Sequence, residues 1–546
     1  MNKTFLQHSF LLFVLALLLL GIGAGDSSLW DIDEPNNAQA LKEMTSRGDY
    51  ALPTFNGELR PDKPILNYWV MAGMTRLFGF NEWGLRAGAV LFGALLVLLM
   101  AVQARRLFDA QTGLMAALLG ATALHSQVIF RAAVPDPLLI FFVALGLLSW
   151  LAGYLNPASR RRDYLLSYAA LALAVLAKGP IGVLLPGLII LLFLAWRRDL
   201  PHLWREGRLG LGIPLFLLIA VPWYVWAWWA SEGEWLRQFL GAHNVDRFLD
   251  PMEGHRGPLL YYLATIPVAL LPWSVLLPQA LAAPWRRFGA RLAQQAPAQA
   301  FLMVWALTWI AFFSLAATKL PNYVWPAYPP LFILIALRLV QALRGELPLR
   351  RGGALLSMAV LLAAGIALIV AGQVQIPKAV PELPALGVLG LPYAAAGLLG
   401  LAFLWRQRLA PAVAGLSAAA AALTFVLVAW ALPHLEEAKP SRSFGQLIQG
   451  LQGEAPYTLA SWRWFQPSLL FYGGRGEQQI HRLTDLQELK RLLAMGRPVY
   501  LALPQAELPA LSRVLGGRAR AYLLMEKRDL YSGKVVALVR IEPRHP

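Results

Sequence analysis

The chain has 546 residues, of which 58% are hydrophobic and only 14% are charged, and its mean hydropathy is +0.52. Roughly a quarter of the residues of a soluble protein are charged, so this composition excludes an ordinary soluble protein and indicates a chain that crosses a membrane many times. The net charge of +17 could suggest a nucleic-acid partner. The arginines, however, lie in short clusters between apolar runs, which is typical of cytoplasmic membrane loops and argues against such a partner. Cysteine is absent, which excludes disulfides and thiolate metal sites.

Apolar runs long enough to cross a bilayer follow one another through residues 1–432, and we predict about 13 transmembrane helices there. The predicted spans are 5–25, 82–104, 112–130, 137–155, 164–177, 180–196, 209–230, 258–283, 299–317, 324–343, 353–374, 390–406 and 410–432. Small residues after the first run also fit a signal-peptide cleavage site. The sequence therefore predicts an all-α polytopic membrane domain over residues 1–432.

Arginine clusters predict which loops face the cytoplasm. Positive residues are enriched in cytoplasmic loops, and here every second loop carries a cluster, such as Arg105–Arg106 or Arg160–Arg162. This alternation predicts a cytoplasmic N-terminus. The two longest loops without such a cluster, 26–81 and 231–257, then face the opposite side of the membrane.

The first external loop carries three carboxylates, Asp31, Asp33 and Glu34, directly before Pro35. Apolar residues then recur at helical spacing up to Gly48, which predicts an amphipathic helix on the membrane surface, with Asp33 suited to its N-cap. Asp31-Ile-Asp33 also has the D-x-D form by which many nucleotide-sugar transferases hold a metal, although no nucleotide-binding domain precedes it. We expect no required cofactor, with a divalent cation on oxygen ligands as the alternative.

Cations and aromatic residues gather in the external loops and at the adjoining span ends. They are Lys63 next to Asp62, Lys178, Lys319, Tyr323, and the pair His243 and Arg247, with Asp136 at a further span end on the same side. A single Lys or Arg at a span end often anchors a helix in the interface. As a set, these fixed cations suit a lipid-linked phosphate whose apolar tail lies in the bilayer.

Residues 433–546 are more polar and alternate short apolar stretches with helical segments. This pattern predicts a small α/β domain on the external face of the membrane. We interpret it as a lid or packing module without chemistry of its own.

Several segments of the chain resemble the polyprenyl-phosphate-dependent glycosyltransferases of the GT-C architecture. They are "DIDEPNNAQALKEM", "RPDKPILNYW", "AKGPIG", "KLPNYVWPAYPPL" and "PSLLFYGGR". They are most similar to motifs of the bacterial aminoarabinose transferases, which move 4-amino-4-deoxy-L-arabinose from undecaprenyl phosphate to lipid A. Protein O-mannosyltransferases share the architecture and the acidic first-loop pair, but lack the later motifs.

The resemblance implies roles for the matching residues. Asp33, with its neighbour Glu34, would be the catalytic or acceptor-site carboxylate. The implied donor-phosphate ligands are Lys63, Arg247, Tyr323 and Lys178, and the implied supports of the cavity are Asp62, Asp136, His243 and Lys319; no metal ligand is implied. The chain departs from the family pattern at Asp62, where the family has Glu, and at Asn36 and Gln39, where an Arg and a Glu are missing.

The resemblance also implies a location and partners. We expect a multi-pass protein of the bacterial inner membrane, monomeric and surrounded by membrane lipids, with its active site facing the periplasm. The donor would be a polyprenyl-phosphate sugar and the acceptor lipid A or another envelope molecule. A protein or glycan O-glycosyltransferase of the same architecture, a transporter of a polyprenyl-linked sugar and a non-catalytic scaffold are the alternatives.

Overall fold

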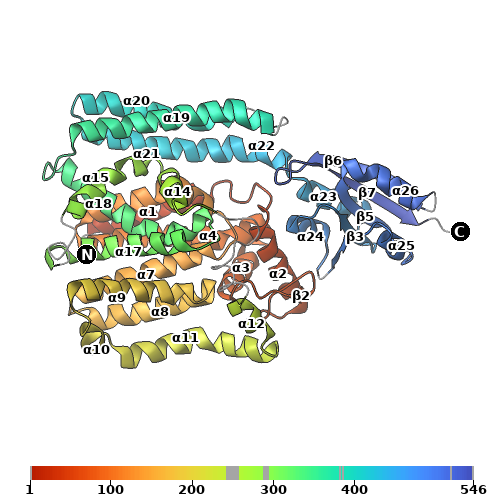
Figure 1. The fold of residues 1–546 in the computed structure, drawn as a ribbon, viewed down its shortest axis with the longest axis horizontal. Coiled ribbons are helices and arrows are strands. Elements are labelled where there is room, and N and C mark those ends of the chain that lie inside the picture. The colour runs from red at the N-terminus through yellow and green to blue at the C-terminus, as the bar shows by residue number, and fades with distance from the viewer. Residues whose placement is uncertain are drawn as a thin grey trace.

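The structure is a long helical bundle joined at one end to a small α/β domain (Figure 1). The computed structural model describes residues 3–241, 257–286, 294–379, 383, 386–476, 478–516 and 519–543. The α/β domain projects from the end of the bundle where the first loop also lies, so the two longest polar segments of the described chain share one end of the molecule.

The bundle is formed by the helices between residues 3 and 437, apart from those of the first loop. They are α1 (Lys3–Gly21), α4 (Glu82–Leu107), α5 (Ala110–Thr122), α6 (Leu124–Ile129), α7 (Asp136–Leu155), α8 (Arg160–Lys178), α9 (Ile181–Arg197), α10 (His202–Glu206), α11 (Leu209–Ala230), α12 (Glu234–Leu240), α14 (Tyr261–Ala269), η2 (Trp273–Leu276), α15 (Leu277–Arg286), α17 (Pro297–Leu315), η3 (Pro321–Ala327), α18 (Tyr328–Leu343), α19 (Arg351–Ala379), η4 (Leu386–Gly390), α20 (Leu391–Trp405), α21 (Leu409–Val426), η5 (Leu427–Ala431) and α22 (Leu432–Glu437). Every predicted apolar run is thus helical.

Nine helices within the described ranges are long and apolar enough to cross a membrane, or ten if the bent pair Tyr261–Ala269 and Trp273–Ala282 forms one span. This is fewer than the predicted number for three local reasons. The run at 112–130 is broken at Ala123, α8 begins with four charged residues, and α9 has only 17 residues.

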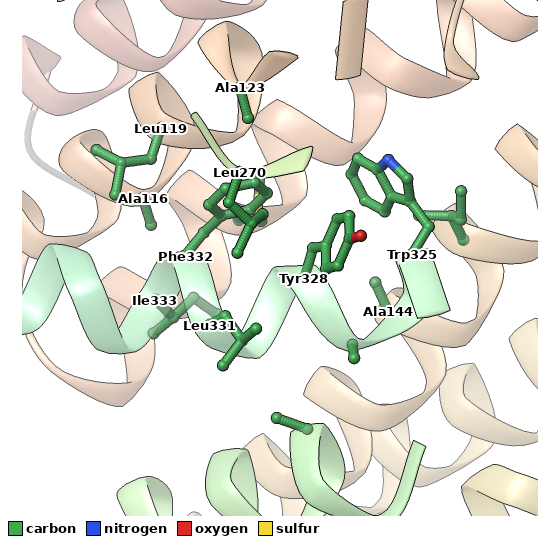
Figure 2. Packing of buried hydrophobic residues seen from close by; sticks show 14 of the residues in the cluster. Ala116, Leu119, Ala123, Ala144, Leu270, Trp325, Tyr328, Leu331, Phe332 and Ile333 are labelled. Atoms are coloured by element: carbon green, nitrogen blue, oxygen red, sulfur yellow. The ribbon is translucent and has the colours of Figure 1, made fainter. Parts of the chain in front are cut away.

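The centre of the bundle is built around η3 and α18. Trp325, Tyr328 and Phe332 are fully buried there, and Figure 2 shows Phe332 beside Leu270, with Leu119 and Ala116 to one side and Tyr328 and Trp325 to the other. The neighbouring α5 positions are mostly alanine or glycine, which lets the two helices approach closely. This packed centre gives the residues before η3 a rigid base.

The first loop folds against the bundle as two helices and a hairpin: α2 (Asp33–Arg47), β1 (Thr54–Phe55), β2 (Glu58–Leu59) and α3 (Leu66–Phe78). The predicted helix ending at Gly48 is confirmed, since Gly48 adopts the left-handed conformation with φ 68°. The helix begins at Asp33 itself, without a capping side chain, so the N-cap interpretation of Asp33 is wrong. Nine of its fifteen residues are buried, so protein covers more of α2 than a helix lying on a membrane surface would allow.

The C-terminal region forms a mixed five-stranded sheet with helices on both faces. Its elements after α22 are α23 (Pro440–Gln452), β3 (Thr458–Trp462), α24 (Pro467–Gly473), β4 (Ile480–Leu483), α25 (Glu488–Leu493), β5 (Val499–Pro504), η6 (Gln505–Glu507), α26 (Leu508–Leu515), β6 (Ala519–Arg528) and β7 (Val535–Pro543). The strand order is β4-β3-β5-β7-β6, with β4, β3 and β5 parallel and β7 antiparallel to both of its neighbours. Helices α25 and α26 cover one face and α23 and α24 the other.

A buried ion pair ties the start of α2 to the bundle. Glu34 accepts two hydrogen bonds from Arg86 of α4, at 2.8 Å to Nε and 2.6 Å to Nη2, and both side chains are only 2% exposed. Arg86 also donates to the backbone carbonyls of Ala24, Ser27 and Ser28. The pair therefore fixes the end of α1, the start of α2 and α4 relative to one another.

Replacement of Arg86 should destabilise the fold strongly. Arg86→Met leaves the Glu34 carboxylate buried without its partner, and we expect a loss of about 3–5 kcal/mol in the free energy of unfolding. Thermal unfolding in detergent measures this loss. The same change at the exposed Arg161 should leave the midpoint unchanged, and Glu34→Leu in addition to Arg86→Met should recover part of the loss. An unaltered midpoint for Arg86→Met would contradict the proposed anchor.

Candidate active site

Asp33 lies exposed at the first position of α2, at the end of the bundle that carries the α/β domain. Of the residues that the structure describes, none forms a hydrogen bond with its carboxylate. Arg60 is close enough to interact with it: burial lowers the pKa of this guanidinium, but Tyr68, Asp62 and, to a smaller extent, Asp33 raise it. Asp33 is thus a solvent-accessible carboxylate beside a fixed positive charge.

The segment after the hairpin concentrates charge next to Asp33. Asp62 bridges Arg60 at 2.7 Å and Lys63 at 2.8 Å, and the three side chains are 11–17% exposed. Pro61 and Pro64 flank the pair Asp62-Lys63 and restrict its backbone. Two cations that share one carboxylate leave a net positive charge, which favours an anionic ligand.

The charged segment is attached to α2 and α3 by a polar chain. Arg60 Nε donates to the Tyr68 hydroxyl at 3.3 Å, and that hydroxyl is 3.5 Å from Asn37 Oδ1 of α2. Trp235 of α12 donates its indole N–H to the Arg60 carbonyl at 3.2 Å. Arg60 is therefore held from three sides.

A second charged group joins the ends of three elements of the bundle. Asp136 at the start of α7 accepts from Lys178 at the end of α8 at 2.7 Å, and from Asn322 of η3 at 3.0 Å. The Lys178 ammonium also lies 5.3 Å from the centre of the Tyr323 ring. An acidic residue at a helix N-terminus and a basic one at a C-terminus each match the local helix dipole, so the sequence positions both ions favourably.

The two charged groups are connected through α2 and α3. Asn37 donates to the carbonyl of Ala133, three residues before Asp136, at 3.1 Å. Ile65 and Leu176 belong to one buried apolar cluster, and they lie two residues from Lys63 and Lys178 respectively. Sequence-predicted residues from three distant segments thus gather at the same end of the bundle.

Two other predicted residues, Glu34 and Lys319, make contacts within the fold. Glu34 is buried in the ion pair with Arg86: burial raises the pKa of its carboxyl, but Arg86 and two backbone N–H groups hold it below its ordinary value. Lys319 donates to the carbonyls of Ser314 and Ala316 at the end of α17. These contacts give both side chains a structural role, and the predicted part of Glu34 in catalysis and of Lys319 in the cavity stays a prediction. His243 and Arg247 lie outside the described residues.

The two aspartates of the D-x-D pattern, Asp31 and Asp33, have different environments. Asp31 accepts from the backbone N–H of Ser468 at 3.0 Å and from its hydroxyl at 2.5 Å, whereas Asp33 is exposed. Asp31 is thus committed to the α/β domain. Within the described residues no group of three His, Asp or Glu side chains gathers as a metal site would require.

Four site residues were missed by sequence reasoning: Arg60, Tyr68, Asn37 and Asn322. Arg60 stands two positions before Asp62 in the conspicuous segment "RPDKP", so its charge was a usable signal. Asn37, Tyr68 and Asn322 carry no such signal, because their contacts come from segments 31 and 186 residues apart.

The chain is similar to known membrane glycosyltransferases in both sequence and fold. Residues 62–226 match the family model of dolichyl-phosphate-mannose-protein mannosyltransferase. A curated protein of Pseudomonas paraeruginosa, undecaprenyl phosphate-alpha-4-amino-4-deoxy-L-arabinose arabinosyl transferase, is 37% identical over 63% of this chain. The matched part spans only 64% of that relative's own length.

Two solved structures have a similar fold. ArnT from Cupriavidus metallidurans bound to undecaprenyl phosphate superposes with a TM-score of 0.78 over 97% of both chains, at 23% identity. The apo oligosaccharyltransferase from Archaeoglobus fulgidus gives a TM-score of 0.52 at 12% identity, over 93% of this chain and 71% of the other. The predicted GT-C fold is confirmed, and with its apolar helices the chain is an integral membrane protein.

Asp33 and Lys178 should differ sharply in their effect on stability. We expect Asp33→Asn to change the free energy of unfolding by no more than about 0.5 kcal/mol, because the carboxylate is exposed. Lys178→Met leaves the buried Asp136 without its ion-pair partner, and we expect a loss of about 1–3 kcal/mol. Thermal midpoints in detergent compare the two. A similar loss for both variants would show that Asp33 is part of the structural frame.

Proposed function

We propose that this chain, an ArnT-like protein with the GT-C fold, is an integral membrane glycosyltransferase. It transfers a sugar from an undecaprenyl phosphate donor to an acceptor outside the cytoplasm, with 4-amino-4-deoxy-L-arabinose as the sugar and lipid A as the acceptor. We place it in the bacterial inner membrane with the site facing the periplasm. The observation that carries this proposal is the exposed carboxylate of Asp33 beside the positive segment around Arg60 and Lys63, at one end of an apolar bundle.

The donor phosphate explains why cations are needed. When the bond between the anomeric carbon and the phosphate oxygen breaks, negative charge grows on the leaving phosphate. Cations held in place before the reaction stabilise that charge more in the transition state than in the ground state. Arg60, Lys63 and Lys178 supply such charges, and each is oriented by a carboxylate, so the reaction needs little rearrangement of the site.

The polyprenyl chain of the donor explains why the site lies on a membrane protein. The apolar tail stays in the bilayer beside the helices, while the phosphate and sugar reach the polar end of the bundle. A soluble enzyme would have to pull the polyprenyl tail out of the bilayer, at a large cost in hydrophobic free energy.

The role of Asp33 depends on the acceptor. If a hydroxyl attacks, Asp33 accepts its proton as general base. If a lipid A phosphate attacks, its oxygen is already ionised, and Asp33 instead positions the reactants, for example by pairing with an amino group of the sugar. The match to a protein mannosyltransferase family model keeps a hydroxyl acceptor as the second candidate.

Reconstituted protein tests the proposal directly. Purified protein in liposomes receives undecaprenyl phosphate carrying radiolabelled aminoarabinose, together with lipid A. We expect the label to move to lipid A, and Asp33→Asn to lower the rate by about 100-fold or more. Asp485→Asn, at an exposed aspartate of the α/β domain, is the matched control and should be fully active.

Three results would contradict parts of the proposal. Label that crosses the bilayer on its original lipid indicates a transporter. Label that moves to a hydroxyl acceptor but never to lipid A supports the second candidate. Full activity of Asp33→Asn on both acceptor types removes Asp33 from the reaction.

A further inference from the structure

Asp31 has no place in the proposed reaction, yet it makes two polar contacts between the first loop and the α/β domain. Its two oxygens accept from the N–H and the hydroxyl of Ser468 at the start of α24. The Ser468 hydroxyl also lies 2.7 Å from the Ser441 hydroxyl of α23. The Asp31 carboxylate is therefore bonded directly to α24 and, through the Ser468 hydroxyl, linked to α23.

The residues before Asp31 are held in the same way. Ser28 donates its N–H and hydroxyl to Glu436, Leu29 donates its N–H to the Tyr472 hydroxyl, and Asp31 donates its N–H to the Tyr531 hydroxyl. Lys439 donates to the Ser28 carbonyl at 2.8 Å and lies 4.3 Å from the centre of a Trp30 ring. The backbone from Ser28 to Asp31 is thus bonded to the last part of the chain nearly residue by residue.

These contacts end directly before the reactive group. Asp33 follows Asp31 by two residues, a distance of at most about 7 Å along the backbone. On its other side Glu34 is fixed to Arg86. Asp33 is therefore an exposed side chain held between two anchored neighbours, one anchored to the α/β domain and one to the bundle.

The contacts carry buried charge, which distinguishes them from ordinary packing. Burial raises the pKa of Asp31 to about 6, against the lowering effect of its bonds to Ser468. Burial also lowers the pKa of Lys439 to about 8. Apolar residues of the same size would hold the domain in place without this desolvation, whereas hydrogen bonds from a carboxylate fix direction as well as distance.

We propose that the α/β domain positions the reactive carboxylate of the transferase, with Asp31, Ser468 and Lys439 as positioning residues. The clamp, defined as residues 28–31 with their partners Glu436, Lys439, Ser468, Tyr472 and Tyr531, fixes where α2 begins and so where Asp33 points. This inference rests on the proposed function. It replaces our interpretation of the domain as a lid or packing module.

The test uses full-length protein in liposomes and two independent measurements. Ser468→Ala removes the hydroxyl from Asp31 and keeps the backbone N–H bond, so the protein should fold. We expect kcat for sugar transfer to fall about 10- to 100-fold, the effect of a misplacement of about 1 Å, with KM for the donor nearly unchanged. Hydrogen exchange, followed by mass spectrometry, should speed up in the peptide that contains residues 28–33.

Further variants give the test its controls. Ser512→Ala, at an exposed serine of α26, should change neither measurement. Ser441→Ala removes only the outer hydroxyl of the clamp and should give a smaller loss of kcat. Asp31→Ala should behave like Ser468→Ala or worse, and Asp31→Asn, which can still bond to both Ser468 groups, should restore most of the activity.

The outcomes separate this inference from the proposed function. If Ser468→Ala and Asp31→Ala speed exchange at residues 28–33 but leave kcat unchanged while Asp33→Asn is inactive, the positioning role is overturned and the transferase stands. If kcat falls without faster exchange, the clamp does not hold the segment and the inference also fails. If Asp33→Asn is fully active, the proposed function itself fails.

Discussion

The buried pair of Glu34 and Arg86 is the constraint on which the site depends. A chain that places two ions at 2% exposure must satisfy nearly every polar atom on them, and here the partners come from the end of α1, the start of α2, the residues before α7 and α4. Removing either ion leaves the other as an uncompensated buried charge. The interaction therefore forces four segments to meet at one point, and α2 can begin in only one place.

Asp33 gains its exposure from the same arrangement. It stands next to a glutamate that the bundle holds and two residues after an aspartate that the α/β domain holds, so its carboxylate can be open to solvent without being mobile. The nearby cations are held as well: Arg60 by Asp62 and the Tyr68 hydroxyl, and Lys178 by Asp136, which also accepts from Asn322. Preorganised groups of this kind need little rearrangement during a reaction.

Much of this could be read from the sequence, and the reasons are local. Apolar runs and arginine clusters predicted the bundle, because each span must be apolar and must form its backbone hydrogen bonds within its own helix. The helix ending at Gly48 was visible from its periodicity and its terminal glycine. The contacts of Glu34, Lys319 and Asp31 were not visible, because a charged side chain that bonds to Arg86, Ser468 or a backbone carbonyl looks the same in sequence as one that binds a substrate. The reason for Gln39 was not visible either. Its amide donates to the buried Glu43 at 2.9 Å, whereas the glutamate that the family has at this position would place two carboxylates next to each other.

The hydrogen bonds between Ser28 and Glu436 span 408 positions of the sequence. A ribosome completes the first of these residues long before the second, and the membrane receives α1 and the first loop while the rest of the protein does not yet exist. With the α/β domain in the proposed positioning role, Asp33 reaches its final orientation only after the last helix has been inserted and that domain has folded. An incomplete chain would therefore carry its charged side chains at the membrane surface without an assembled site, and competence for transfer would arise only when synthesis is finished.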